Sequence, residues 1–177
     1  MNPHFESKYK IENYIKKIGI QYTIIRPVFF MENFLSPWTI PSLREGRYKT
    51  PMPPKRKLQM ISINDIGKFV SHIIEYRENF INKSIDIASD EISGKEATKI
   101  LSDYSGHTME YFELPPSEYK NMSEDMLKMY EWFNEVGYNI DINKLHKLYP
   151  YIKWLTFEDW VKEQDWSILD QHIPQII

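Results

Sequence analysis

The chain has 177 residues, of which 42% are apolar and 15% aromatic, enough to bury one sizeable core in a single domain. Its net charge of −3, from 22 basic and 25 acidic residues, gives no overall field that attracts nucleic acid or an anionic membrane. The absence of cysteine excludes disulfides, thiolate nucleophiles and cysteine-based metal sites. The polar N-terminus resembles no signal peptide and no stretch is long enough to span a membrane, so we expect a soluble, cytoplasmic protein.

The first elements predicted along the chain are a helix over residues 7–18 and a buried strand over residues 22–26. Gly19 stands where a left-handed helix cap is needed. The strand is apolar and β-branched without alternation, which is typical of a strand covered on both faces, and Pro27 then removes a ladder donor. The helix carries an apolar stripe at three- and four-residue spacing, formed by Ile11, Tyr14, Ile15 and Ile18.

A proline-rich segment separates this unit from a second strand and helix. Prolines at 37, 41, 51, 53 and 54 exclude a long helix or central strand between Phe34 and Lys57. Residues 59–63 predict a strand, and Asn64 or Asp65 is expected to cap the helix that follows. The buried stripe predicted for that helix consists of Ile66, Phe69, Val70, Ile73 and Ile74.

The rest of the chain predicts two more strands and then helices. Residues 84–88 form a third strand, Ser93 and Glu96 a capping box for a helix that Gly106 ends, and residues 108–112 a more exposed strand at an edge. We expect the strands near 22–26, 60–63 and 84–88 to be parallel members of one sheet, joined by helices. The later helices are predicted from Ser123 to Gly137, with Met126, Met129, Tyr130 and Phe133 facing inward, and at 141–148 and 156–164.

Several strings, read in order, resemble the NmrA-like family of atypical short-chain dehydrogenases. They are His4-Phe5-Glu6-Ser7-Lys8, Thr23-Ile24-Ile25-Arg26-Pro27, Phe30-Met31-Glu32-Asn33-Phe34, Ile61-Ser62-Ile63-Asn64-Asp65-Ile66-Gly67, Met129-Tyr130-Glu131-Trp132-Phe133-Asn134 and Phe157-Glu158-Asp159-Trp160. The resemblance implies an α/β fold, an incomplete Rossmann-like parallel sheet with helices over residues 1–90. An α-rich substrate or partner region then follows over residues 91–177.

The glycine-rich turn that holds a dinucleotide's pyrophosphate in such folds is missing from this sequence. The six glycines stand at 19, 46, 67, 94, 106 and 137, and no two are close enough to cradle a phosphate. The chain therefore resembles the C-terminal portion of the family, as a truncated gene product, an expressed fragment or one half of a split protein. We expect it to bind NAD or NADP only if the N-terminal half is supplied, and to expose a sheet edge that favours self-association.

The resemblance places two groups of candidate site residues. Lys8 and His4 have the spacing of the Tyr-x-x-x-Lys pair, in which the lysine contacts the nicotinamide ribose and lowers the pKa of the neighbouring acid. Here histidine replaces tyrosine, although an imidazole can also carry a proton near neutrality. The turn of Phe30, Met31, Glu32 and Asn33 lies beyond the carboxyl end of a strand, where ligands bind in open α/β sheets. These four residues would line the nicotinamide end.

Three functions follow from these expectations. The first is an NAD(P)H-dependent reductase, the second a non-catalytic redox sensor acting through a protein partner, which His4 in place of tyrosine favours, and the third a degenerate fragment. The histidines at 72, 107, 146 and 172 lack the spacing of metal ligands, so we expect no metal. Neither the substrate nor the partner can be read from the sequence.

Overall fold

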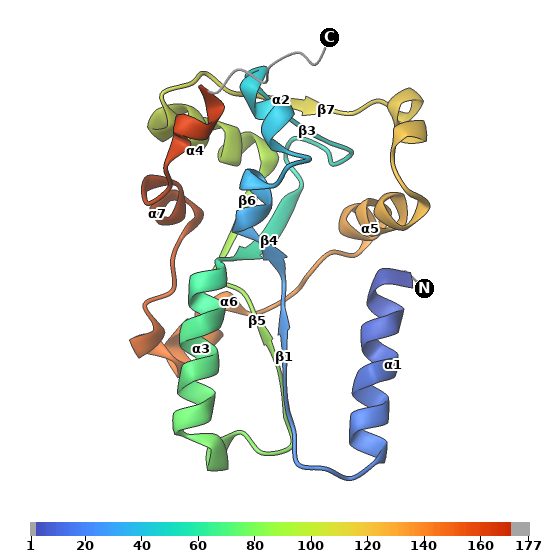
Figure 1. Cartoon of the computed structure of the whole chain (residues 1–177), viewed down its shortest axis with the longest axis vertical. Coiled ribbons are helices and arrows are strands. Elements are labelled where there is room, and N and C mark those ends of the chain that lie inside the picture. Colours follow the sequence, from blue (N-terminus) through green and yellow to red (C-terminus); the bar gives the residue numbers. More distant parts are fainter. Residues whose placement is uncertain (1–2, 171–177) are drawn as a thin grey trace.

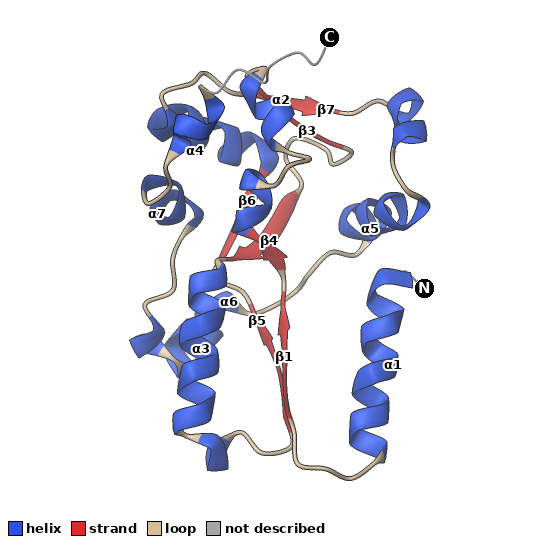
Figure 2. Ribbon diagram, viewed as in Figure 1, coloured by secondary structure: helices blue, strands red, loops and turns tan. Residues whose placement is uncertain are grey.

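The protein, shown as a computed structural model, is described over residues 3–170 and is a mixed α/β structure (Figures 1 and 2). The helices are α1 (Pro3–Lys17), α2 (Ile40–Arg44), α3 (Ile63–Glu75), α4 (Gly94–Ser105), α5 (Glu124–Glu135), α6 (Ile142–Leu148) and α7 (Phe157–Lys162). The strands are β1 (Thr23–Pro27), β2 (Phe29–Phe30), β3 (Arg47–Thr50), β4 (Lys57–Ile61), β5 (Lys83–Ile87), β6 (Asp90–Ser93) and β7 (Glu110–Glu113). Short 3-10 helices complete the structure, one of them at Met31–Leu35.

The strands form three small ladders. β1 pairs in parallel with β5, and β3 pairs in parallel with β7. β4 pairs in parallel with β2 and antiparallel with β6. The parallel pairing predicted for the first and third strands is confirmed. The expectation of a single sheet was wrong for β4, because after Pro27 the chain leaves the ladder with β5 and continues from Val28 into β2, which pairs with β4.

The β1 and β5 ladder lies between α1 on one face and α3 with α6 on the other (Figure 1). Ile25 and Ile85 pack against the cluster that contains Phe69 of α3 and Leu145 of α6. Arg26 points to the opposite face and bonds Glu12 of α1. This arrangement places α1 on the face of the sheet that faces away from the core.

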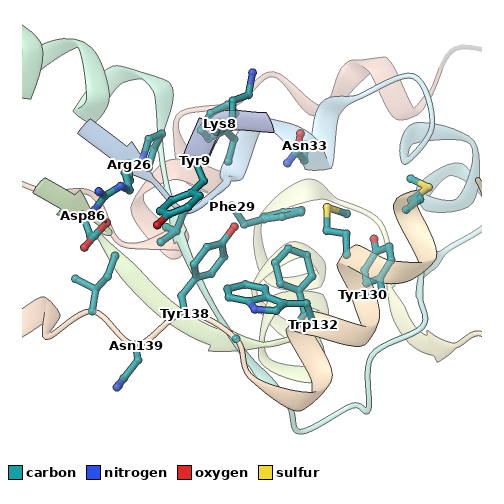
Figure 3. A pocket seen from close by; sticks show the side chains of 18 of the residues that line it. Lys8, Tyr9, Arg26, Phe29, Asn33, Asp86, Tyr130, Trp132, Tyr138 and Asn139 are labelled. Carbon is teal, nitrogen blue, oxygen red and sulfur yellow. Dashed lines mark hydrogen bonds and ion pairs between the residues drawn. The ribbon is translucent and has the colours of Figure 1, made fainter. Parts of the chain in front are cut away.

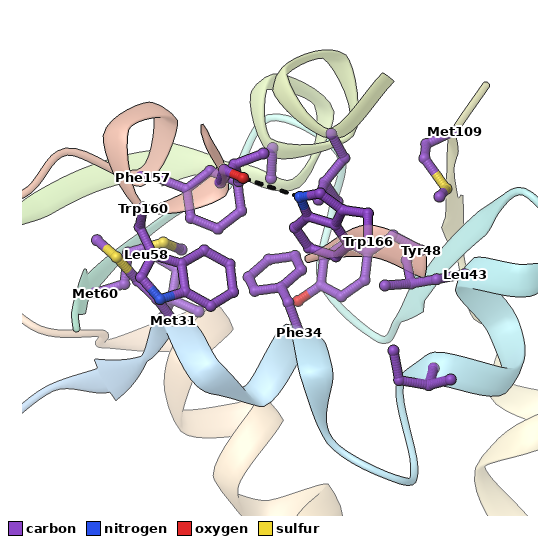
Figure 4. Packing of buried hydrophobic residues seen from close by; sticks show 14 of the residues in the cluster. Met31, Phe34, Leu43, Tyr48, Leu58, Met60, Met109, Phe157, Trp160 and Trp166 are labelled. Carbon is purple, nitrogen blue, oxygen red and sulfur yellow. Dashed lines mark hydrogen bonds between the residues drawn. The ribbon is translucent and has the colours of Figure 1, made fainter. Parts of the chain in front are cut away.

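The second and larger core lies around the 3-10 helix Met31–Leu35, between α4, α5 and α7 (Figure 4). Phe34 is at its centre and stacks on Tyr48 with ring centroids 4.6 Å apart. Phe157 and Trp160 of α7 lie against the same ring, so residues more than 100 positions apart meet here. Each core contains residues from both regions distinguished in the sequence, 1–90 and 91–177, so the two regions pack together.

Helix termini follow the predicted local signals with one exception. The Ser93 and Glu96 capping box is present, and Gly106 adopts a left-handed φ of 77°. The cap predicted for α3 at Asn64 or Asp65 was wrong: Ser62 is the cap, and its hydroxyl accepts a hydrogen bond from the backbone N–H of Asp65. The Asp65 carboxylate is instead fully buried and accepts from the backbone N–H of Leu155, which ties the C-terminal region to α3.

One residue of the buried stripe predicted for α3 is exposed, and most of the apolar stripe of α1 is exposed. Ile74 of α3 is 70% exposed, because it lies on the side of the helix that faces away from the sheet. On α1, Ile11, Tyr14 and Ile18 are 54%, 64% and 47% exposed, and none of the described α1 side chains is buried. The apolar stripe of α1 was predicted in the right place, but no described segment covers it.

We expect the isolated chain to self-associate in solution. The outer edge of β1 has no strand partner within residues 3–170, and the exposed apolar stripe of α1 lies beside it. Unpaired strand edges and apolar patches favour pairing with another chain. Light scattering over a concentration series measures this, and Ile24→Lys should reduce the association while Ile74→Lys, on the far side of the sheet, should not. A monodisperse monomer at high concentration would contradict the expectation.

Candidate functional site

A cavity of about 1500 Å³ lies between α1, β1 and α5 (Figure 3). Its walls come from the α1 side chains that face the sheet, from every residue of β1, from the turn after β2 and from one side of α5. Ligand pockets usually occupy about 300–1000 Å³, so this cavity is large enough for more than one group. It runs along the whole of β1 and continues past the carboxyl end of that strand to the turn after β2, and open α/β sheets bind ligands beyond the carboxyl ends of their strands.

Lys8 lies at the rim of the cavity. Figure 3 shows its ammonium directed away from the aromatic side chains that line the interior. No ion pair or hydrogen bond joins this ammonium to any residue within the described range 3–170. Its neighbour His4 lies in the first turn of α1, one helical turn earlier, and its side chain is outside the described residues.

Some side chains of the turn after β2 line the cavity, and the others point into the core. Phe30, 36% exposed, and Asn33 line the cavity together with Phe29. Met31 is completely buried in the larger core and does not reach the cavity. Glu32 also points inward: its Oε1 accepts hydrogen bonds from the backbone N–H of Ile63 and from the indole Nε1 of Trp160.

These contacts give the four residues of the turn different roles. Phe30 and Asn33 line the cavity, whereas Met31 and Glu32 anchor the turn to the core and to the N-terminus of α3. Glu32 has a second oxygen, Oε2, that is buried and has no protein hydrogen-bond partner within the described residues. The two hydrogen bonds of Oε1 tie the turn to Ile63 of α3 and to Trp160 of α7.

An ion-pair network closes the end of the cavity beside β5. The guanidinium of Arg26 donates from Nε and Nη2 to the two oxygens of Glu12, at 2.8 and 2.7 Å, and from Nη1 to Asp86 at 3.1 Å. The hydrogen bond to Glu12 is the main cause that raises the pKa of Arg26, and the same bond lowers the pKa of Glu12. Through the Arg26 and Glu12 pair, this network joins α1 to β1 by side-chain hydrogen bonds.

Tyr138 brings a hydroxyl into the same cavity and was not predicted as a site residue. It follows Gly137, whose left-handed φ of 73° ends the α5 segment, and its ring packs against Trp132 and Phe133. Burial raises the pKa of Tyr138, so its phenol stays protonated at neutral pH. Its position after a helix-ending glycine, outside the helical stripe, is the signal in the sequence that could have set it apart from core tyrosines.

Comparison with protein families gives a match to the NmrA-like family over residues 1–161. The chain belongs to the NmrA-like family. Within residues 3–170 of this NmrA-like chain, no helix is both long and apolar enough to cross a bilayer, and no three His, Asp or Glu side chains gather as metal ligands.

Known proteins similar to this NmrA-like chain include both an enzyme and a regulator. Prestalk A differentiation protein A of Dictyostelium discoideum is 29% identical over 117 residues, which are 66% of this chain and 38% of that protein. An NADPH-dependent quinone oxidoreductase of Escherichia coli has a TM-score of 0.69 at 21% identity, covering 88% of this chain and 59% of its own. The negative transcriptional regulator NmrA, solved with NADP, has a TM-score of 0.63 at 16% identity, covering 88% and 56%.

The two structural likenesses show the fold. The chain spans about 60% of the length of the solved structures it resembles and 38% of the curated relative. The activity, cofactor and partners of those longer proteins therefore do not carry over directly to this chain.

Proposed function

We propose that this chain forms the nicotinamide and substrate side of a cytoplasmic NAD(P)H-dependent reductase. The observation that carries the proposal is that Lys8, Asn33 and Phe30 line one large cavity, with Lys8 at its rim and the Lys8 ammonium without a hydrogen-bond or ion-pair partner among residues 3–170. A cation, an amide and a flat aromatic wall are the groups that a nicotinamide riboside needs.

The residues present fit the nicotinamide half of NADP or NAD. Lys8 would donate to the ribose hydroxyls, Asn33 would pair with the carboxamide, and Phe30 would pack against one face of the ring. When bound, the dinucleotide supplies a hydride. Arg26 and Glu12 already neutralise each other, so they close the cavity without competing for the ligand.

Proton transfer is assigned to two groups, the imidazole of His4 and the hydroxyl of Tyr138. His4 and Lys8 have the spacing of the Tyr-x-x-x-Lys pair that the resemblance implies, and in that role an imidazole would exchange a proton near neutral pH. The Tyr138 hydroxyl, held in its protonated form by burial, would donate a proton to the reduced product from the opposite wall.

We expect Lys8→Met to weaken binding of reduced nicotinamide mononucleotide by about tenfold or more. A hydrogen bond to a charged group contributes about 1.5–3 kcal/mol, which corresponds to at least a tenfold change in affinity. The measurement is an NMR titration of backbone amides, in which Asn33 and Phe30 should shift with the ligand concentration.

Lys10→Met is the matched control, because Lys10 lies on the same helix but pairs with Glu6 outside the cavity. It should leave the affinity unchanged. Equal losses in the two variants, or shifts confined to residues outside the cavity, would remove the basis of the proposal.

A second candidate function is a redox sensor that binds the dinucleotide without turning it over and acts on a protein partner. It is favoured by His4, which stands where the reductase pair has tyrosine. Hydride transfer from NADPH to a panel of quinones distinguishes the two, because a sensor binds the nicotinamide and leaves the quinones unreduced. A chain that neither binds nor reduces would be a degenerate fragment.

A further inference from the structure

The part of the cavity wall that carries Tyr138 is a segment without regular secondary structure. Residues 137–140 lie between α5 and α6 and belong to no strand ladder among the described residues. Figure 3 shows Tyr138 and Asn139 pointing to opposite sides of this segment, with the Tyr138 ring on the side of Phe29. Because no ladder fixes the backbone here, other contacts must hold the Tyr138 hydroxyl in place.

Gln59 of β4 holds the far end of this segment. Its side-chain amide donates from Nε2 to the carbonyl of Ile140 at 2.9 Å, and its Oε1 accepts from the backbone N–H of Ile140 at 3.0 Å. Opposed residues of an antiparallel ladder exchange the same pair of bonds, so the amide takes the place of a neighbouring strand. Gln59 is only 5% exposed. Losing this pairing would leave a buried amide without partners, which is costly.

Arg56, just before β4, holds the near end of the segment. Its guanidinium donates from Nε to the carbonyl of Phe133 at 2.9 Å and from Nη2 to the carbonyl of Val136 at 3.0 Å. The end of a helix leaves such carbonyls without an intrahelical partner, and a cation is favourable there. Gly137 fits beside the guanidinium because it has no Cβ, which would lie 2.8 Å from Nη2 of Arg56. The end of α5 and the start of the segment are therefore fixed together.

We propose that Gln59 and Arg56 are positioning residues that together fix the Tyr138 hydroxyl in the cavity. Neither of them is among the residues that line the cavity, and both act through the backbone at the two ends of the segment that carries Tyr138. Their importance for proton transfer rests on the proposed function. The position of the hydroxyl can be measured without any ligand.

The ionisation of Tyr138 reports this position, because burial raises the pKa of its phenol and exposure would return the pKa to that of an ordinary tyrosine. The full chain is isotope-labelled at the tyrosine Cζ for NMR, and Tyr138→Phe identifies the resonance. At about pH 10.5, Gln59→Met should raise the ionised fraction of Tyr138 at least tenfold, because methionine has a similar length but cannot pair with Ile140. Arg56→Met should act in the same direction.

Tyr130 is the internal reference for this titration. It lines the same cavity from α5, ahead of both contacts, and burial raises its pKa to about 12. Its ionisation should stay unchanged in both variants. Equal gains in ionisation for Tyr130 and Tyr138 would mean that the whole cavity had opened, and would overturn the proposal.

Gln164→Met is the matched control for Gln59→Met, because the Gln164 amide also donates to a backbone carbonyl, that of Trp160, and does not line the cavity. Lys55→Met serves for Arg56→Met, since Lys55 is its exposed neighbour. Neither control should change the Tyr138 resonance.

Circular dichroism establishes that each variant is folded, and Arg56→Met decides alone if Gln59→Met unfolds. A Tyr138 resonance that is unchanged in the folded variants, or that changes equally in the controls, would contradict the positioning role. Because the titration needs no nicotinamide, failure here is distinguishable from failure of the Lys8 experiment.

Discussion

Phe34→Ala is expected to lower the free energy of unfolding by about 3–5 kcal/mol, as large aromatic truncations in a core do. The Phe34 side chain is 1% exposed and touches the ring of Tyr48 from β3 and the rings of Phe157 and Trp160 from α7. Removing the ring therefore leaves a cavity where all three meet. Because a domain of this size has a total stability of about 5–15 kcal/mol, the loss would be a large fraction of it.

Urea unfolding followed by tryptophan fluorescence measures this change. Phe30→Ala is the control, since it removes the same side chain from the same segment at a position that is 36% exposed. It should cost about 1 kcal/mol or less. Similar losses in the two variants would mean that the aromatic cluster around Phe34 does not hold the larger core together.

NADPH is expected to bind the 177-residue chain no more than a few times more tightly than reduced nicotinamide mononucleotide. In a complete dinucleotide site, backbone N–H groups of a glycine-rich turn and the N-terminus of a helix hold the pyrophosphate. Each such bond to a charged group contributes about 1.5–3 kcal/mol, so a full set raises affinity by orders of magnitude. The glycines of this chain are dispersed among separate turns and helices.

Calorimetry with the two ligands under the same buffer and salt gives the ratio of their affinities. Lys8→Met should reduce both affinities by the same factor, because it acts only on the part that the ligands share. A hundredfold preference for NADPH would show instead that side chains of this chain hold the phosphates.

Local signals in the sequence predicted local structure well. The capping box at Ser93 and the left-handed glycine at Gly106 depend only on residues within a few positions, and both are present. The parallel pairing of β1 with β5 could be expected from their isoleucines and from the helices between them, whereas the burial predicted for the first strand was wrong, because every residue of β1 is only half-buried. The short α2 and β3 agree with the limits that the prolines set.

Long-range contacts explain what the sequence could not predict. The roles of Met31 and Glu32 depend on Trp160, about 130 residues later, which draws the Glu32 carboxylate inward. The exposure of Ile74 depends on how wide a face of α3 packs against the sheet. The spacing of apolar residues shows where that face is centred but not how wide it is. Tyr138 belongs to no motif, and only the fold places it in the same cavity as Lys8.

Helix α1 differs from the other long helices in how little of it is tied to the rest of the molecule. It lies beside α5 and is joined to β1 by residues 18–22 and by the Arg26 and Glu12 pair, whereas α3 and α4 bury Phe69 and Leu101 completely. The free energy for local opening of a segment follows the apolar contacts that must be broken. Backbone amides of α1 therefore exchange with deuterium through a local opening that leaves the sheet intact. A ligand that fills the space between α1 and β1 supplies the missing contacts, so that occupation of the cavity and ordering of the helix are a single event.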